Sequence, residues 1–335
     1  MPLSSPSTSR PYLISRRRLC GTTAALVPGF FAKVAGAATP STIRVGHFPN
    51  ITHVQALVAR NLSRREKGWF EQRLGVGVEW FTYNAGPSAM EAIFASSIDL
   101  TFVGPSPAIN AYAKSRGAEV RIIAGAANGG SALVVQPGAG LRAPADFRGK
   151  KIATPQLGNT QDVAARAWLT AGGLRITLTG GDAQVVPAAN PDQLSLFRTK
   201  QVDAVWTVEP WVSRLQTEAG GEILVDERDA ITTVLVSSAK FLGSQRDLAR
   251  RFAQAHQELT AWIRANPDQA RTMARDELAA ETRVEVSPDL VARAWSRIEL
   301  TTDVSQSALE RFVANAKAAG FLRTAPDLGR LVETL

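Results

Sequence analysis

The order of apolar runs along the chain is the feature that most restricts its fold. Between Ile43 and Ala124, short β-type runs alternate with stretches whose apolar residues recur at helical spacing. The pattern restarts after a glycine-rich stretch, 125–130, and continues to Trp206. Strands that alternate with helices pair in parallel, because each crossover helix returns the chain to the same end of the sheet. The sequence therefore predicts an α/β fold of two units, each a mainly parallel sheet flanked by helices.

The expected elements follow from this alternation. Strands are expected at 43–46, 76–81, 100–103, 120–124, 132–135, 151–153, 184–186, 204–206 and 231–236. Helices are expected at 54–66, 87–97, 105–116, 160–171 and 191–199, and the chain beyond about 245 is expected to be helical. Because the strand at 231–236 would return the chain to the first unit, we expect one lobe to comprise 38–126 plus 235–335 and the other 127–234.

The first 37 residues have the order of a secretory signal. A basic cluster, Arg16 to Arg18, precedes a weakly apolar run that ends in the small-residue pattern 35–37. This order predicts a cleaved signal peptide, and the paired arginines resemble the twin-arginine type. A mature membrane anchor is the alternative, but the apolar run is shorter than the roughly 20 residues of a span and is interrupted by Pro28 and Lys33. We therefore expect a periplasmic protein.

The positive charge of the chain belongs largely to this segment. Cleavage after Ala37 removes five cations and no acid, which lowers the formal charge from +8 to +3. Nucleic acid is therefore not an expected partner, although a strongly basic chain would suggest one. Cys20, the only cysteine, is removed as well. The mature protein is expected to have no disulfide, no thiol nucleophile and no cysteine-ligated metal.

Six strand-to-helix turns are candidates for a binding site, since ligands of open α/β sheets lie beyond the carboxyl ends of the strands. Each turn contains at least one of three features: a proline near the first helical turn, a Ser, Thr or Asn near the cap, or a glycine. They are 47–50, 83–88, 104–107, 154–161, 189–193 and 206–211. Ordinary helix capping accounts for any one of them. Several converging on one cleft would form an anion site from backbone N–H groups alone.

These turns and their neighbours resemble the periplasmic binding proteins of ABC importers for sulfonate, taurine and nitrate, over roughly residues 42–265. The matching segments are Asn84–Ala92, Ser97–Leu100, Val103–Ile109, Pro144–Gln161, Val202–Ala204 and Glu209–Trp211. The resemblance implies a two-lobed type II fold, or Venus flytrap, with a helical C-terminal segment. It also implies a monomer without cofactor or metal that delivers a small anionic ligand to an ABC permease in the inner membrane.

Within that resemblance, an aliphatic sulfonate or taurine is the first candidate ligand. Nitrate, bicarbonate or a thiamine precursor is the alternative, and an exported enzyme on the same fold is a further one. The family's ligand contacts fall on Phe48, Asn50, Gly86, Ser88, Gly104, Ser106, Asn159, Thr160, Gln161, Trp206, Glu209 and Trp211.

Different roles are expected for different members of this set. The hypothesis is that Ser88, Ser106, Thr160 and Gln161 hold an oxoanion head while Trp206 and Trp211 shape the wall around the tail. A carboxylate that faces an anion is unfavourable. Glu209 therefore either accepts from a positive group of the ligand or pairs structurally.

Catalytic and metal sites are not predicted. His47 and His53 are six residues apart across a strand-to-helix loop, so they do not share a helix face as metal ligands would. His47 is a candidate for the cleft wall. Residues 237–240 match a Ser-x-x-Lys pattern, but its companion motifs are missing. Glu209 with His47 is the only candidate pair for an enzyme.

The signal peptide generates a prediction about the mature chain. The periplasmic protein is expected to begin at or within a few residues of Ala38, which intact-mass analysis measures. If the twin-arginine route is used, replacing Arg16 and Arg17 by Lys blocks export. A mature protein that retains Met1 contradicts the prediction.

Overall fold

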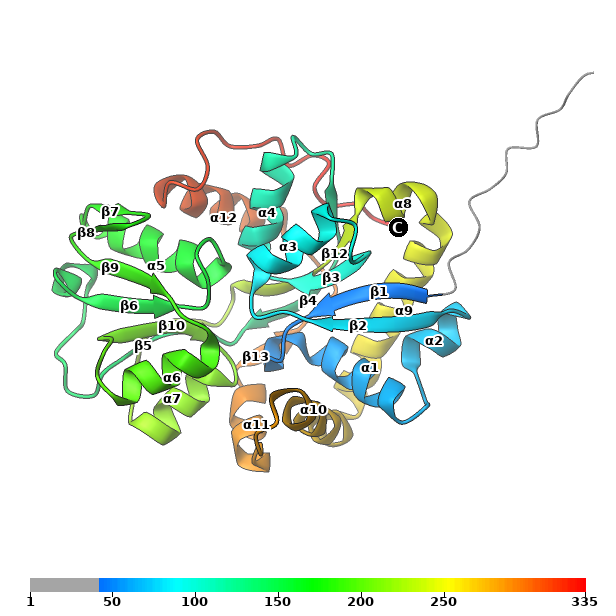
Figure 1. Ribbon diagram of the computed structural model, residues 1–335, viewed down its shortest axis with the longest axis horizontal. Helices are drawn as coiled ribbons and strands as arrows, with labels where there is room; N and C mark the ends of the chain where they lie inside the picture. Colours follow the sequence, from blue (N-terminus) through cyan, green and yellow to red (C-terminus); the bar gives the residue numbers. More distant parts are fainter. Residues whose placement is uncertain (1–41) are drawn as a thin grey trace, which may run out of the picture. The chain divides into compact units, whose positions relative to one another are not determined.

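Two mixed β-sheets organise the chain in the computed structural model, which describes residues 42–335 (Figure 1). The predicted signal peptide, 1–37, lies outside the described residues. Helices flank both sheets, as the alternating pattern predicts. Within 42–335, none of the helices has both the length and the hydropathy needed to cross a bilayer.

The first sheet has the strand order β13-β4-β12-β3-β1-β2. Its strands are β1 (Thr42–His47), β2 (Gly77–Thr82), β3 (Leu100–Val103), β4 (Val120–Gly129), β12 (Ile231–Ser238) and β13 (Ile298–Leu300). β1 pairs in parallel with β2 and β3, whereas β12 is antiparallel to β3 and β4, and β13 is antiparallel to β4. The helices that follow its first strands are α1 (Val54–Arg64), α2 (Trp69–Leu74), α3 (Gly86–Phe94) and α4 (Pro105–Lys114).

The second sheet has the order β11-β5-β10-β6-β9. Its strands are β5 (Ser131–Val135), β6 (Lys151–Thr154), β9 (Gln184–Pro187), β10 (Ala204–Val208) and β11 (Glu222–Glu227). β6 is parallel to β9 and β10, and β5 is antiparallel to β10 and β11. Its helices are α5 (Thr160–Ala171), α6 (Asn190–Arg198) and α7 (Trp211–Ala219), and a hairpin of β7 (Ile176–Thr177) and β8 (Gly180–Gly181) follows α5.

The expectation of two α/β units is confirmed, but each sheet is mixed rather than mainly parallel. The antiparallel strands lie where the chain passes between sheets: β4 leads directly into β5, and β11 leads into β12. Glycine is required at the first crossing, where Gly129 and Gly130 have φ values of 75° and 73°. A Cβ on Gly129 would lie 2.5 Å from the Arg297 carbonyl oxygen. The backbone could not approach so closely with a larger residue.

Most expected elements are present, with ends shifted by a few residues, and α5 begins and ends as predicted at 160–171. Its cap explains this agreement, because the Asn159 side chain accepts from the Asp162 N–H at 2.8 Å. The elements that were not predicted include α2, α7, β7, β8, β11 and the three-residue β13. All of these except α7 have at most six residues, which are too few to show a clear period.

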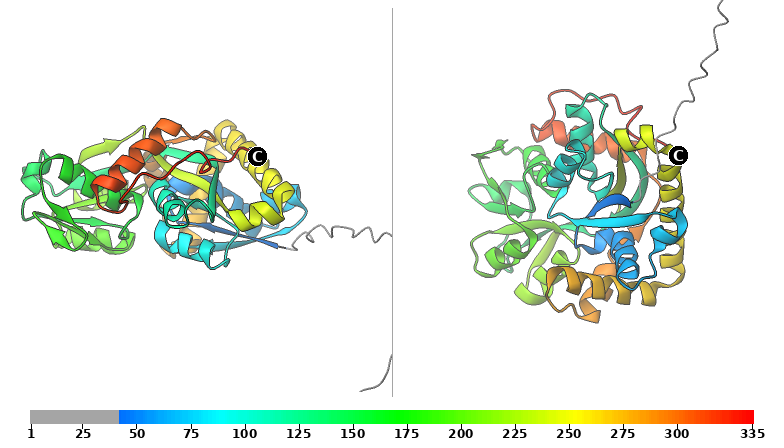
Figure 2. Two further views of the ribbon diagram at one scale, coloured as in Figure 1. Left: turned by 90° about the horizontal axis from the view of Figure 1, so that it is seen from above. Right: turned by 45° about the vertical axis from the view of Figure 1, so that its right-hand side comes forward.

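The chain after β12 is helical, as expected. Its helices are α8 (Ala239–Ser244), α9 (Arg246–Ala265), α10 (Pro267–Thr282), α11 (Pro288–Trp295) and α12 (Gln306–Ala318). α9 and α10 contribute to the core of the first sheet. α12 packs against both α4 and α5, so it joins helices of the two sheets (Figure 2).

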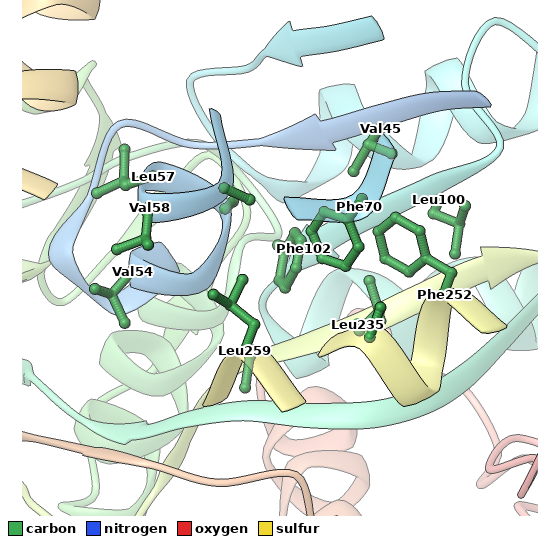
Figure 3. Packing of buried hydrophobic residues seen from close by; sticks show 14 of the residues in the cluster. Val45, Val54, Leu57, Val58, Phe70, Leu100, Phe102, Leu235, Phe252 and Leu259 are labelled. Carbon is green, nitrogen blue, oxygen red and sulfur yellow. The ribbon is translucent and has the colours of Figure 1, made fainter. Parts of the chain in front are cut away.

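The core of the first sheet depends on an aromatic pair. Phe70 of α2 and Phe252 of α9 are fully buried and stack with ring centroids 4.1 Å apart, beside Phe102, Leu100 and Leu235 (Figure 3). Close-packed interiors do not refill a deleted ring, so truncation leaves a cavity.

We expect Phe252→Ala to lower the free energy of unfolding by about 3–5 kcal/mol, because it removes the buried ring and leaves a cavity. Urea unfolding measures the change. The matched control is Phe94→Ala, since Phe94 is 40% exposed and its truncation is expected to cost less than about 1 kcal/mol. Equal losses in the two variants would contradict this account of the core.

Candidate functional site

Residues that follow strands of both sheets line one small cavity. The lining residues are Phe48, Asn50, Thr52, His53, Asn84, Ala85, Gly86, Gly104, Pro107, Pro155, Asn159, Thr160, Gln161, Asn190, Val208 and Thr232. The cavity has a volume of about 20 Å³, which is room for about one water-sized group. It is therefore too small for a whole organic molecule.

The starts of four helices meet at this cavity. α3 begins at Gly86, α4 follows Gly104, α5 begins at Thr160 and α6 begins at Asn190, and all four of these residues line it. The first N–H groups of a helix have no partner within that helix, and its N-terminus carries a partial positive charge. None of the lining residues is Asp, Glu, Lys or Arg. The arrangement can hold an anion through neutral donors and helix dipoles alone.

His53 is a lining residue that the sequence analysis did not include. Burial lowers the pKa of its imidazole well below 6.5, and the neighbouring His47 lowers it further. Its Nδ1 accepts from the Phe48 N–H at 3.4 Å. The proton of the neutral ring is therefore assigned to Nε2, which makes His53 a hydrogen-bond donor. Only its position directly before α1, at the N-cap, could have suggested a site role from the sequence.

The cavity brings together seven of the twelve predicted site residues. They are Phe48, Asn50, Gly86, Gly104, Asn159, Thr160 and Gln161. The other five, Ser88, Ser106, Trp206, Glu209 and Trp211, lie outside its lining.

Ser88 and Ser106 form contacts between helices of the two sheets. The Gln156 side chain donates to Ser88 Oγ at 3.0 Å, and the Ser106 N–H donates to Thr160 Oγ1 at 3.4 Å. The Ser106 hydroxyl is buried without a hydrogen-bond partner in the described part of the chain. Ser88 therefore joins α3 to the turn between β6 and α5, and Ser106 joins α4 to the start of α5, both beside the cavity rather than in its wall.

Trp206 is not a wall of the cavity. Its indole is 2% exposed, donates to Glu227 at 3.0 Å and packs edge-on against Trp168. The reason is its distance from the strand end: Trp206 contributes to the core beneath α5, whereas Val208, on the same face but two residues later at the carboxyl end of β10, lines the cavity.

Glu209 forms a buried ion pair with Arg297 and a hydrogen bond with Ser213. Its carboxylate is fully buried, lies 2.7 Å from Arg297 Nε, and accepts from the Ser213 hydroxyl at 3.0 Å. Burial raises the pKa of Glu209, while Ser213 and Arg297 oppose the increase. Its carbonyl oxygen accepts from the Ile51 N–H at 3.0 Å. Glu209 thus fastens the loop after β1 to the end of β10, and the geometry favours the second of its two expected roles.

Trp211 forms part of a partition beside the cavity. Its Nε1 donates to Asn50 Oδ1 at 3.2 Å, and Asn190 Nδ2 donates to the same oxygen at 3.4 Å. Asn50 follows β1, whereas Trp211 and Asn190 belong to helices of the second sheet. The side-chain amide oxygen of Asn50 therefore joins residues from both sheets.

His47 is not in the cleft wall and does not meet Glu209. It is fully buried, and its Nε2 lies 3.2 Å from Glu281 Oε1 and 2.8 Å from Arg60. The candidate catalytic pair is therefore not formed, because each member has its own partners. Across residues 42–335, no group of three or more His, Cys, Asp or Glu side chains is placed to hold a metal ion.

The fold and the place of the cavity define a class, the type II periplasmic binding proteins. The alkanesulfonate-binding protein SsuA from Xanthomonas axonopodis pv. citri bound to MOPS has the same fold. Its TM-score is 0.70 at 20% identity, over 89% of this chain and all of that one. The nitrate-binding protein NrtA from Synechocystis PCC 6803 has a TM-score of 0.70 at 14% identity, over 85% and 83% of the two chains.

The sequence comparisons give the family. The NMT1-like family model matches residues 36–277, and the chain belongs to that family. A Bacillus subtilis (strain 168) protein named for the binding of aliphatic sulfonates is 26% identical over 235 residues, which are 67% of this chain and 68% of that protein. These relatives are binding proteins rather than enzymes, and this chain is a solute-binding protein of the same broad group.

The buried ion pair generates a prediction about stability. Arg297→Met leaves the Glu209 carboxylate buried without its cation, and we expect a loss of about 3–5 kcal/mol in the free energy of unfolding. Glu209→Gln combined with Arg297→Met is expected to recover much of that loss, because no charge remains buried. Urea unfolding measures both variants.

Arg228→Met is the matched control for Arg297→Met. Arg228 pairs with Asp226, as Arg297 does, but the Arg228 side chain is 54% exposed. Its loss is therefore expected to lower the free energy of unfolding by less than about 1 kcal/mol. A double variant as unstable as Arg297→Met alone would show that lost packing, not unpaired charge, causes the effect.

Proposed function

We propose that this protein is the extracytoplasmic solute-binding component of an ABC importer and that it captures a small oxoanion-bearing ligand, with an aliphatic sulfonate or taurine as the first candidate. One observation carries the proposal: four helix N-termini meet at a cavity that contains neutral donors and no charged side chain. Such a site binds an anion without the charge-pairing that a cationic pocket requires.

The names of similar proteins support the class of ligand. They include an alkanesulfonate-binding protein, a nitrate-binding protein and a taurine-binding periplasmic protein of Escherichia coli (strain K12). These ligands have a small oxoanion group in common. Because the cavity has room for only about one water-sized group, such a group would enter while the lobes are open, and a sulfonate would need further room for its tail.

The proposal includes closure of two lobes, 38–126 with 235–335 and 127–234, on the ligand. The chain passes between the sheets at 129–131 and again between β11 and β12, so these two crossings are the proposed hinge. Hydrogen bonds between Asn50 and Trp211 and between Ser88 and Gln156 would close the cleft. The closed form would then dock on an inner-membrane permease.

A thermal-shift screen of the cleaved protein tests the class of ligand. The probes are methanesulfonate, taurine, nitrate, sulfate and bicarbonate. A true ligand at 100 times its dissociation constant stabilises the protein by about 2.7 kcal/mol. Stabilisation by none of these anions would overturn the proposed function.

Thr160 gives a sharper prediction because it lies in the first turn of α5 and lines the cavity. Thr160→Val keeps the volume of the side chain but removes its hydroxyl. A hydrogen bond to a charged group contributes about 1.5–3 kcal/mol, so we expect at least tenfold weaker binding by calorimetry. Arg250→Ala is the control and should leave affinity unchanged, because the Arg250 side chain is 53% exposed on α9 and does not line the cavity. Unchanged affinity in Thr160→Val means that the oxoanion lies elsewhere.

A further inference from the structure

One ring nitrogen of His53 is a donor without a partner in the protein. The ring lines the small cavity, is 2% exposed and lies against the Phe48 ring, with centroids 4.4 Å apart. Its Nδ1 accepts from the Phe48 N–H at 3.4 Å, so the proton is assigned to Nε2. Among residues 42–335, that Nε2–H forms no hydrogen bond. A buried donor gains most from an acceptor, so this nitrogen is suited to an oxygen of a bound anion.

The orientation and the charge of this imidazole are fixed by its surroundings. His53 stands at the N-cap of α1, and its backbone N–H donates to the Asn50 carbonyl oxygen at 2.9 Å. Burial and the neighbouring His47 lower its pKa, which keeps the ring neutral. A second ring proton, on Nδ1, would meet the Phe48 N–H, which is itself a donor. His53 is therefore a neutral donor of fixed orientation.

The amide oxygens of the cavity wall are mostly engaged as acceptors within the protein. The side-chain oxygen of Asn50 accepts two hydrogen bonds, and those of Asn159, Gln161 and Asn190 accept one each. Asn84, the remaining amide of the wall, is exposed, and no carboxylate lines the cavity. A hydroxyl group on the ligand would therefore find few acceptors, whereas every oxygen of a fully ionised anion could accept from a donor.

We propose that His53 binds the ligand directly through its Nε2–H, and that it makes the site specific for oxoanions that carry no hydroxyl group. This inference rests on the proposed function, because it needs an oxoanion in the small cavity. Sulfonate and nitrate groups have only acceptor oxygens, so they can meet both His53 and the helix N–H groups. Bicarbonate and a singly ionised phosphonate carry one O–H group, which would face another donor or stay unpaired.

The first test compares pairs of anions that have nearly the same shape and differ by one proton. Methanesulfonate is paired with methylphosphonate in mildly acidic buffer, where the phosphonate keeps one P–OH group. Nitrate is paired with bicarbonate in mildly alkaline buffer. Calorimetry of the cleaved protein measures the affinities. In each pair that binds, the anion without a hydroxyl group is expected to bind at least about tenfold more tightly.

Two substitutions separate the donor role of His53 from its role in specificity. His53→Leu offers no donor and is expected to weaken methanesulfonate binding at least about tenfold. His53→Gln offers an N–H and also an oxygen that can accept, because a side-chain amide can turn either end toward the ligand. This variant is expected to retain methanesulfonate binding and to bind methylphosphonate more tightly than the unsubstituted protein does.

His256→Gln is the matched control for these variants. His256 is also fully buried, and its Nε2 donates to the Gly125 carbonyl oxygen at 2.7 Å, but it does not line the cavity. We expect this variant to change neither the affinity for methanesulfonate nor the preference over methylphosphonate.

Nitrogen NMR of the histidine rings tests the contact without any substitution. The chain has three histidines, and single variants assign their signals. His53 is expected to be neutral with its proton on Nε2, and methanesulfonate is expected to shift the Nε2 signal of His53 but not that of His256.

The outcomes separate this inference from the proposed function. If methanesulfonate binds but the Nε2 signal of His53 does not move, or if His53→Leu keeps full affinity, the role of His53 is overturned and the oxoanion site stands. Equal affinities within a pair, or a preference unchanged in His53→Gln, overturn its role in specificity. If neither methanesulfonate nor nitrate binds, the proposed class of ligand and this inference are overturned together.

Discussion

The buried ion pair between Arg297 and Glu209 connects the ends of the two sheets. Arg297 precedes β13 of the first sheet, and it pairs with Glu209 at the end of β10 and with Asp226 in β11 of the second. Two ions taken out of water are stable only when they are well paired, so this contact tolerates little displacement. The Glu209 carbonyl then fixes Ile51, and the loop from Phe48 to Asn50 is positioned as a consequence.

That positioning leaves a cavity whose wall has no Asp, Glu, Lys or Arg, which is the basis of the proposed anion site. The charged groups close to it are committed to one another: His47 faces Glu281 and Arg60, and Glu209 faces Arg297. What remains at the cavity is helix N-termini and neutral donors, with His53 kept neutral by burial. Such donors keep their orientation and need no change of protonation to bind a ligand.

Trp211 links the loop after β1 to α7 beside the small cavity. Its indole N–H contacts the loop after β1, whereas its ring contacts the Arg214 guanidinium. Tryptophan suits this position because it has one polar edge and a large apolar face.

The sequence by itself determined the alternation of strands and helices, the two α/β units, and seven residues of the cavity, because strand ends and helix caps are encoded locally. α5 and its Asn159 cap are the clearest example. Only the tertiary structure decided that the sheets are mixed, that Trp206 lies in a core, and that Glu209 pairs with Arg297. Those outcomes depend on contacts between residues far apart in the sequence, such as Glu209 and Arg297, which are 88 positions apart. No local pattern records which distant side chain completes a buried pair or covers a given face.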